Sequence, residues 1–194
     1  MTSNHEMRNF FDRLAPNWNN HPEEYYIREK ITALADFPEG NLIADIGCGQ
    51  GVMLEHLLKT NPREIIAIDL SAEMLKHARK NFTDPRITFM NADFLETDLP
   101  PLDAIILYNA YPHFLNKEAL ARKTAEIIRK NGYLIIAHGC GKAGINSGHS
   151  GERVSPLSAA LEDAEKEAAK FKDFFTPEVT VDNDELYFVK MRRI

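Results

Sequence analysis

The sequence has little cysteine, no long apolar run and no excess of basic residues. Its two cysteines, Cys48 and Cys140, form no spaced framework, which argues against a disulfide-stabilised fold. No run reaches the roughly 18 apolar residues that a membrane-spanning helix needs. The first residues, MTSNHEMRNFF, contain no apolar stretch typical of a secretion signal. We therefore expect a cytoplasmic protein that does not enter a membrane.

The charge of the chain bears on its partners. Its formal net charge is -6, whereas proteins that bind nucleic acid through phosphates usually carry a basic excess. The one basic cluster, KMRR at 190–193, is explained equally well by an exposed strand end. Nucleic acid is therefore not expected as a partner, and the oligomeric state stays open.

What the sequence does contain is an alternation of apolar runs and helical patterns. Short continuous apolar runs are typical of strands buried on both faces of a parallel sheet. These runs are LIADI (42–46), EIIAID (64–69), ITFM (87–90), AIILY (104–108) and YLIIAH (133–138). Helical patterns occupy 22–37, 52–59, 72–81 and 117–130. A further helix is indicated by an apolar stripe of Leu157, Leu161, Ala164, Ala168 and Phe171.

Cap residues place the ends of several of these helices. Ser71 and Asn116 are suited to N-cap positions, and the Asn-Gly pair at 131–132 is typical of a helix end. Ser155 and Pro156 fit the N-cap and first position of the last helix.

The end of the chain departs from the alternation. The runs EVTV (178–181) and LYFVKMRR (186–193) are too close in sequence for a parallel crossover, so they must form an antiparallel hairpin. The predicted fold is α/β, a doubly wound seven-stranded, mostly parallel sheet with a C-terminal antiparallel hairpin. We expect one domain over 1–194, in which a helical opening segment or lid at 1–37 precedes a core at 40–194.

The stretch LIADIGCGQG (42–51) places Gly47, Gly49 and Gly51 directly behind a buried strand. Glycine loses the most backbone entropy on folding, so this concentration indicates a ligand that approaches the backbone closely. The third glycine of a dinucleotide fingerprint would fall on Val52, which argues against NAD. No Gly-Lys-Ser/Thr follows, which excludes a P-loop.

The motif ADIGCGQG resembles the D/E-x-G-x-G-x-G motif of class I S-adenosylmethionine (SAM)-dependent methyltransferases. The resemblance extends over about residues 40–140, and the antiparallel last strand agrees with it because NAD-binding Rossmann domains lack one. The opening FFDRLAPNW further resembles the branch that includes ubiquinone/menaquinone-biosynthesis methyltransferases. The resemblance implies SAM as cofactor and S-adenosylhomocysteine as product.

The resemblance also assigns roles to residues at the carboxyl ends of strands. It implies that the methionine part of SAM is bound by Asp45, Gly47, Gly49 and Gly51. Cys48 belongs to the same cofactor-binding turn, where it is explained equally well as a small residue. Asp69 would accept hydrogen bonds from the ribose hydroxyls and Leu70 would pack on the adenine. Asp93 would accept from the adenine amino group with Phe94 alongside, and Asn109 would line the floor where methyl donor and acceptor meet. Taken singly, each aspartate is explained equally well as a turn or cap residue.

The methyl acceptor is indicated less directly. After the fourth strand the chain has NAYPHF (109–114) instead of the Asn/Asp-Pro-Pro-aromatic motif for planar amino nitrogens. The following Gly- and Ser-rich stretch AHGCGKAGINSGHSGERVSP (137–156) is expected to be a loop beside the acceptor pocket. Candidate substrate-binding residues are Trp18, Tyr111, His113, His138 and His149.

His113 and His138 are the candidate general bases, and His138 is preferred because it ends a strand. His138, Cys140 and His149 also allow a metal site, but their spacing matches no strong zinc pattern, so no metal is predicted. The predicted function is methyl transfer from SAM to a small molecule. The alternatives are a protein or tRNA acceptor and a regulatory SAM-binding module without catalysis.

Overall fold

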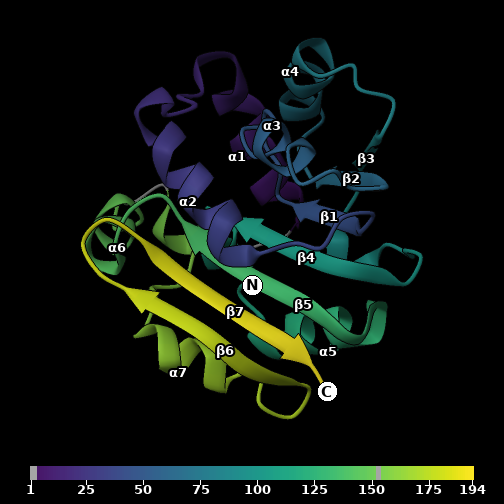
Figure 1. The fold of residues 1–194 in the computed structure, drawn as a ribbon. Helices are drawn as coiled ribbons and strands as arrows, with labels where there is room; N and C mark the ends of the chain where they lie inside the picture. The colour runs from purple at the N-terminus through teal and green to yellow at the C-terminus, as the bar shows by residue number, and fades with distance from the viewer. Residues whose placement is uncertain (1–3, 152–153) are drawn as a thin grey trace. The chain divides into compact units, whose positions relative to one another are not determined.

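The computed structural model describes residues 4–151 and 154–194, and Figure 1 shows its ribbon. Residues 1–3 of the predicted opening segment and 152–153 of the predicted loop lie outside this description. The chain divides into two compact units, Met1–Asp98 and Leu99–Ile194, which are described separately. The expectation of one domain with a lid stays a prediction.

The first unit contains three parallel strands in the order β3-β2-β1. The strands are β1 (Leu42–Ile46), β2 (Glu64–Asp69) and β3 (Ile87–Asn91). Its helices are α1 (Asn4–Leu14), α2 (Tyr25–Ala35), α3 (Leu54–Leu58) and α4 (Ala72–Asn81), with 3-10 turns η1 (Ala15–Asn17), η2 (Pro22–Glu24) and η3 (Phe94–Glu96). Every residue of β1 is buried, as its continuous apolar run predicts.

The second unit contains four strands in the order β4-β5-β7-β6. They are β4 (Leu102–Tyr108), β5 (Ile128–His138), β6 (Phe175–Asp182) and β7 (Tyr187–Arg193). Its helices are α5 (Lys117–Ile127), α6 (Lys142–Gly148) and α7 (Ala164–Ala169), with turns η4 (Tyr111–His113) and η5 (Ser155–Leu157). β4 and β5 are parallel, whereas β7 is antiparallel to both β5 and β6.

The strand order is 3-2-1-4-5-7-6. The predicted seven-stranded, mostly parallel sheet with a C-terminal hairpin is therefore confirmed. Two predicted caps are also confirmed, because the side-chain oxygens of Ser71 and Asn116 accept hydrogen bonds from Met74 N (3.1 Å) and Ala119 N (2.9 Å). No helix in the described ranges is long and apolar enough to cross a membrane.

The predicted helix end at 131–132 is wrong. α5 ends at Ile127, and the Asn-Gly pair lies inside β5, where the register against β4 shifts. Asn131 has a φ of 66°, and a Cβ on Gly132 would lie 2.6 Å from the Asp103 carbonyl oxygen. The pair therefore forms an irregularity in the strand rather than a helix terminus.

The predicted long helix from Ser155 and Pro156 is also wrong. These residues begin a 3-10 turn, and α7 starts only at Ala164. The backbone between them is held by hydrogen bonds to residues distant in sequence. Ala159 N donates to the Pro112 carbonyl (2.9 Å), and Leu161 N donates to Asn146 Oδ1 (2.8 Å). The apolar stripe correctly marks buried residues, although they do not share one helix.

The predicted loop at 137–156 contains a helix, because α6 occupies Lys142–Gly148. Its Asn146 exchanges hydrogen bonds with the backbone of Leu161 at 2.8 and 3.0 Å. A Gly- and Ser-rich composition therefore does not leave this segment without regular structure.

Candidate cofactor and acceptor sites

The glycine turn connects β1 to α3 in the first unit. Gly47, Gly49 and Gly51 have φ values of 70°, 53° and 88°, which side chains with a Cβ rarely adopt. The turn is tied to the neighbouring strand, because Gly47 N and Cys48 N both donate to the Ile68 carbonyl at 2.8 and 3.1 Å. The turn therefore lies at the carboxyl edge of the parallel strands, where open α/β sheets bind ligands.

Gly49 and Gly51 are required for different reasons. A Cβ on Gly51 would lie 2.7 Å from Leu54 Cδ1 and 3.0 Å from the Phe82 ring, so these side chains would have to shift, and its φ of 88° disfavours a side chain in addition. A Cβ on Gly49 would meet nothing within 4 Å. The bare backbone at Gly49 thus borders open space, as a ligand-facing glycine requires.

Asp69 ends β2, and its carboxylate binds two backbone amides. Oδ2 accepts from Gly49 N and Oδ1 accepts from Ser71 N, both at 2.8 Å. Burial nevertheless raises the Asp69 pKa to about 6, against the lowering effect of these two donors. Asp69 therefore fixes the glycine turn against the start of α4, and its contact with a ribose stays a prediction.

Asp45 is a buried carboxylate in β1. It is 1% exposed, and its Oδ2 has no hydrogen-bond partner among the described residues. Burial, and secondarily the charge of Asp69, raises its pKa to about 7. An unpaired buried carboxylate favours a cation beside it, and SAM carries both an ammonium and a sulfonium group. Asp45 and the open backbone at Gly49 therefore fit SAM.

We expect Asp45 to make the ligand-free protein less stable as the pH rises. The unfolded carboxyl ionises near the ordinary value of 3.8, whereas the folded one retains its proton to about 7. The unfolded state therefore binds fewer protons across this window, and the free energy of unfolding falls until pH 7 and then levels off, by up to about 4 kcal/mol. Denaturant titration from pH 4 to 8 should show this slope reduced in Asp45→Asn. It should be unchanged in Asp98→Asn, and an equal slope in both variants would contradict the assignment.

Asp93, Phe94 and Leu70 follow neighbouring strands in the first unit. Asp93 caps η3, with Oδ1 accepting from Leu95 N at 2.9 Å, and its Oδ2 accepts from the Asn4 side-chain amide. Phe94 is buried and Leu70 is half-buried. The carboxylate assigned to the adenine amino group therefore already binds an amide N–H of α1.

The opening segment is hydrogen-bonded to the glycine turn, a contact that the sequence analysis did not predict. Gln50 Nε2 donates to the Ala15 carbonyl (2.7 Å), and Asn20 Nδ2 donates to Gln50 Oε1 (3.0 Å). Asp12 accepts from the Ser71 hydroxyl at 2.5 Å. Trp18 is 38% exposed and packs edge-on against Phe11, with ring centroids 6.0 Å apart. A polar glutamine inside the glycine motif is the one sequence signal for this contact.

Cys48 contributes little polar chemistry to the turn. Its side chain is 5% exposed, and burial raises the pKa of its thiol, so it stays protonated. Cys48 therefore acts as a small apolar residue under the turn.

In the second unit, Asn109 follows β4 in a left-handed conformation. Its φ is 53°, its N–H donates to the Ala137 carbonyl (2.9 Å), and its Oδ1 accepts from Gly139 N (3.2 Å). Asn109 thus links the ends of β4 and β5. Asparagine tolerates this backbone better than most residues, and the side chain is exposed.

The predicted histidines come together in this unit. The rings of His113 and His149 lie 5.1 Å apart, and their Nδ1 atoms lie 2.9 and 2.7 Å from the carbonyls of Leu157 and Ile145. A carbonyl only accepts, so both Nδ1 atoms carry the proton and donate. When the rings are neutral, each Nε2 is then a hydrogen-bond acceptor.

His138 lies deeper than the other two histidines. It is 1% exposed, packs edge-on against Tyr187, and its Nε2 has no hydrogen-bond partner among the described residues. Burial lowers the pKa values of His138 and His113 to about 3 and 4. Both rings are therefore neutral at pH 7 and only weakly basic, which argues against the predicted role of His113 and His138 as general bases.

Tyr111 is a core residue of the second unit. It is fully buried, and its hydroxyl donates to Glu167 Oε2 at 2.6 Å. The Lys117 ammonium lies 3.5 Å from the Tyr111 ring centroid, and burial lowers its pKa to about 7. Sequence reasoning did not select Lys117 or Glu167, since neither belongs to a motif. Within the described ranges, no group of three or more His, Cys, Asp or Glu side chains could hold a metal ion.

Comparison with known proteins places the glycine turn in a family. Residues 43–132 match the family model described as methyltransferase domain. This part of the chain is a SAM-dependent methyltransferase domain. It contains the glycine turn, Asp69, Asp93 and Asn109, so all three strand-end positions assigned to SAM lie inside the matched range.

Relatives and solved structures agree with the methyltransferase domain. The chain is 30% identical over 133 residues to an uncharacterized protein of Methanocaldococcus jannaschii, covering 67% of this chain and 50% of that one. It is 42% identical over 89 residues to a trans-aconitate 2-methyltransferase of Afipia carboxidovorans, covering 44% and 34%. The chain thus spans half or less of the length of these curated relatives.

A solved SAM-dependent methyltransferase from Aquifex aeolicus shares the fold. The two chains superpose with a TM-score of 0.71 over the full length of both, at 16% identity. At this identity the similarity establishes the fold alone.

Proposed function

We propose that this protein transfers a methyl group from SAM to a small molecule that presents a hydroxyl or amine group. The observation that supports it most is the buried Asp45 carboxylate, whose Oδ2 has no hydrogen-bond partner among the described residues, in the strand before a glycine turn whose backbone is open at Gly49. A negative charge and a glycine backbone that a ligand can approach closely suit a cationic ligand with a nucleoside.

In this proposal the first unit binds the cofactor. Asp45 attracts its ammonium group, Gly47, Gly49 and Gly51 admit its methionine part, and Asp69 accepts from the ribose. The adenine lies between Leu70 and Phe94, and its amino group replaces the Asn4 amide on Asp93. Asn109 lines the floor beside the reacting methyl group. The bound SAM supplies an electrophilic methyl group, so the protein mainly positions the two reactants.

The three histidines supply the acceptor wall in this proposal. Nε2 of His138 is a buried ring nitrogen of a neutral imidazole and has no hydrogen-bond partner among the described residues. A hydroxyl or amine of the substrate can both donate and accept, so it would satisfy this nitrogen in either tautomer of the ring. His138 is therefore proposed to orient the acceptor, with His113 and His149 beside it. Its low basicity makes it a weak proton acceptor before the methyl group moves.

The small-molecule acceptor is favoured by charge and by one relative. The net charge of -6 disfavours a polyanionic RNA acceptor, and trans-aconitate, named for the Afipia carboxidovorans relative, is a small molecule. The opening segment resembles the ubiquinone/menaquinone-biosynthesis branch, so phenolic compounds belong in the acceptor panel.

The proposed function is tested by turnover. Purified protein with SAM is screened against phenols, amines, alcohols and carboxylic acids, with tRNA and a protein mixture in parallel, and S-adenosylhomocysteine is measured. We expect turnover with one of the hydroxyl or amine compounds. SAM binding without turnover on any acceptor would indicate a non-catalytic binding module, and turnover on tRNA or protein alone would contradict the small-molecule proposal.

We expect the segment around Trp18 to close over bound SAM. Trp18 is the one tryptophan of the chain and is 38% exposed, so its fluorescence reports this segment alone. Saturating SAM should shift its emission to shorter wavelength as the ring leaves water. Trp18→Phe should abolish the signal and keep SAM binding. An unchanged spectrum with SAM, with and without acceptor, would count against a lid.

A further inference from the structure

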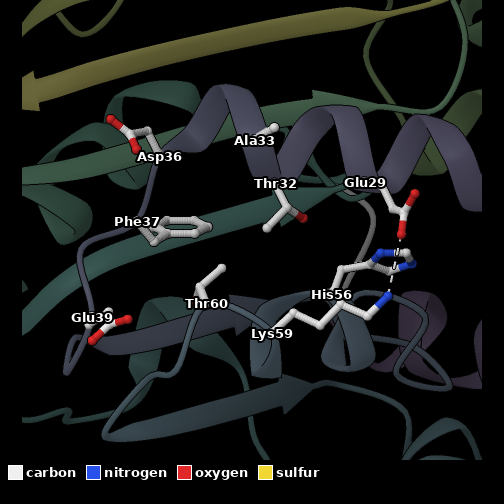
Figure 2. Close-up of a pocket in the computed structure, with 9 residues that line it drawn as sticks. All are labelled: Glu29, Thr32, Ala33, Asp36, Phe37, Glu39, His56, Lys59 and Thr60. Carbon is white, nitrogen blue, oxygen red and sulfur yellow. Dashed lines mark hydrogen bonds and ion pairs between the residues drawn. The ribbon is translucent and has the colours of Figure 1, made fainter.

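A pocket lies in the first unit, away from the glycine turn. Its volume is about 420 Å³, within the range of small-molecule sites. Figure 2 shows the residues that line it: Glu29, Thr32, Ala33, Asp36, Phe37, Glu39, His56, Lys59 and Thr60. They come from α2, from α3 and from the segments that follow these helices.

The pocket lies near the opposite edge of the strands from the proposed cofactor site. Residues 36–39 lead into the start of β1, and Lys59 and Thr60 precede the start of β2. The glycine turn instead follows the end of β1. The pocket is therefore separate from the residues assigned to SAM.

His56 indicates that the pocket binds a ligand. Its side chain is 2% exposed and lines the pocket, and its Nδ1 has no hydrogen-bond partner among the described residues. Tyr25 packs against the ring, with centroids 4.6 Å apart. Burial lowers the His56 pKa, so the ring is neutral. A buried polar nitrogen without a partner is costly, and a group in the pocket would satisfy it.

The charges around the pocket select the kind of ligand. Lys59 is its one basic residue, and it is already paired with Glu29 at 3.4 Å and Glu55 at 3.5 Å. Asp36 and Glu39 are exposed and have no ion-pair partner among the described residues. The pocket therefore has an excess of negative charge, which lies on the carboxylates of Asp36 and Glu39.

The apolar part of the lining suits the same ligand. Phe37 is 7% exposed, and Figure 2 shows its aromatic side chain among the polar residues that line the pocket. An aromatic face attracts cations as well as apolar carbon chains. A metal ion is less suitable, because the described residues contain no metal-binding group of three or more side chains.

We propose that this pocket binds a small organic cation, with an ammonium or guanidinium group between Asp36 and Glu39 and an N–H donor toward His56 Nδ1. The alkyl part of the cation lies against Phe37. This assignment does not depend on methyl transfer, because none of these residues belongs to the cofactor or acceptor sites.

The test uses agmatine, which carries an ammonium and a guanidinium on one alkyl chain. Calorimetry of the full-length protein should give saturable binding with a dissociation constant below about 1 mM. The uncharged 1,4-butanediol and the anionic glutarate should not bind. Absence of saturable agmatine binding, or equal binding of the three compounds, would overturn the proposal.

Matched variants locate the binding. Asp36→Asn with Glu39→Gln should weaken agmatine at least tenfold, and asparagine tolerates the left-handed backbone at position 36, where φ is 48°. Glu118→Gln with Glu126→Gln, on exposed positions of α5, makes the same charge change and should leave the affinity unaltered. His56→Phe keeps the ring and removes Nδ1, and should weaken binding about fivefold. Equal affinity in the two double variants would show that agmatine binds elsewhere and would overturn the proposal, even if His56→Phe fails to fold.

Discussion

Gly49→Val should abolish detectable SAM binding, which corresponds to a loss of at least a hundredfold in affinity. A Cβ at this position meets nothing within 4 Å, so the new side chain would occupy the open space over the turn. That space is where the proposal places the methionine part of SAM. The variant should stay folded, because a Cβ at position 49 displaces no protein atom.

Gly40→Val is the matched control for this variant. Gly40 also has a positive φ, 75°, and a Cβ there also meets nothing within 4 Å. It lies before the start of β1, at the opposite end of that strand from the glycine turn. Both variants should lose a similar amount of stability, roughly 1–2 kcal/mol or more for a β-branched residue in this conformation. Calorimetry should then show normal SAM binding for Gly40→Val and none for Gly49→Val. Full SAM affinity in Gly49→Val would show that Gly49 does not face the ligand.

His138→Phe should lower kcat by about 10²-fold or more on the true acceptor. The change keeps an aromatic ring against Tyr187 and removes Nε2, the atom proposed to orient the acceptor. A loss of this size is what misplacing a reactant costs, because the ring is proposed to orient the acceptor rather than to take its proton. SAM affinity should stay within about twofold, since the proposed cofactor contacts lie mainly in the first unit.

Two readouts separate a positioning role from a loss of packing at His138. His138→Gln retains a hydrogen-bond acceptor and should recover part of kcat, which repair of packing alone would not predict. With SAM saturating, the pH profile of kcat should show no limb near pH 6.5 that His138→Phe removes, because burial lowers the His138 pKa to about 3. Unchanged kcat in His138→Phe, or a wild-type limb near pH 6.5 that this variant removes, would contradict the proposed role.

The fold was predictable where the signal is local. β1, β2 and α4 have the predicted bounds because buried runs and a serine cap are read from adjacent residues. The start of α7 could not be predicted, because Ala159 and Leu161 are hydrogen-bonded to Pro112 and Asn146, which are distant in sequence. The predicted helix end at the Asn-Gly pair, 131–132, was wrong for a different reason. The same two residues occur at helix ends and at strand irregularities, so the pair alone does not tell them apart.

The candidate sites, too, were predictable only where the signal comes from residues close together in the sequence. The glycine spacing and the strand-end aspartates were visible in the sequence. The contacts of the opening segment were not, because Gln50 binds a carbonyl 35 residues away and Asn4 binds Asp93 at a separation of 89. The protonation states of Asp45 and His138 depend on burial, which no single-residue pattern reports.

Calorimetry with SAM, S-adenosylhomocysteine and NAD tests the central claim most directly. Wild-type protein should bind SAM and S-adenosylhomocysteine and not NAD. Asp69→Ala should weaken SAM by roughly 1.5–3 kcal/mol, because a charged hydrogen-bond partner of the ligand is lost. Asp98→Ala, at an exposed carboxylate outside the turn, should bind SAM normally. Binding of NAD by the wild-type protein with no detectable binding of SAM would contradict the account.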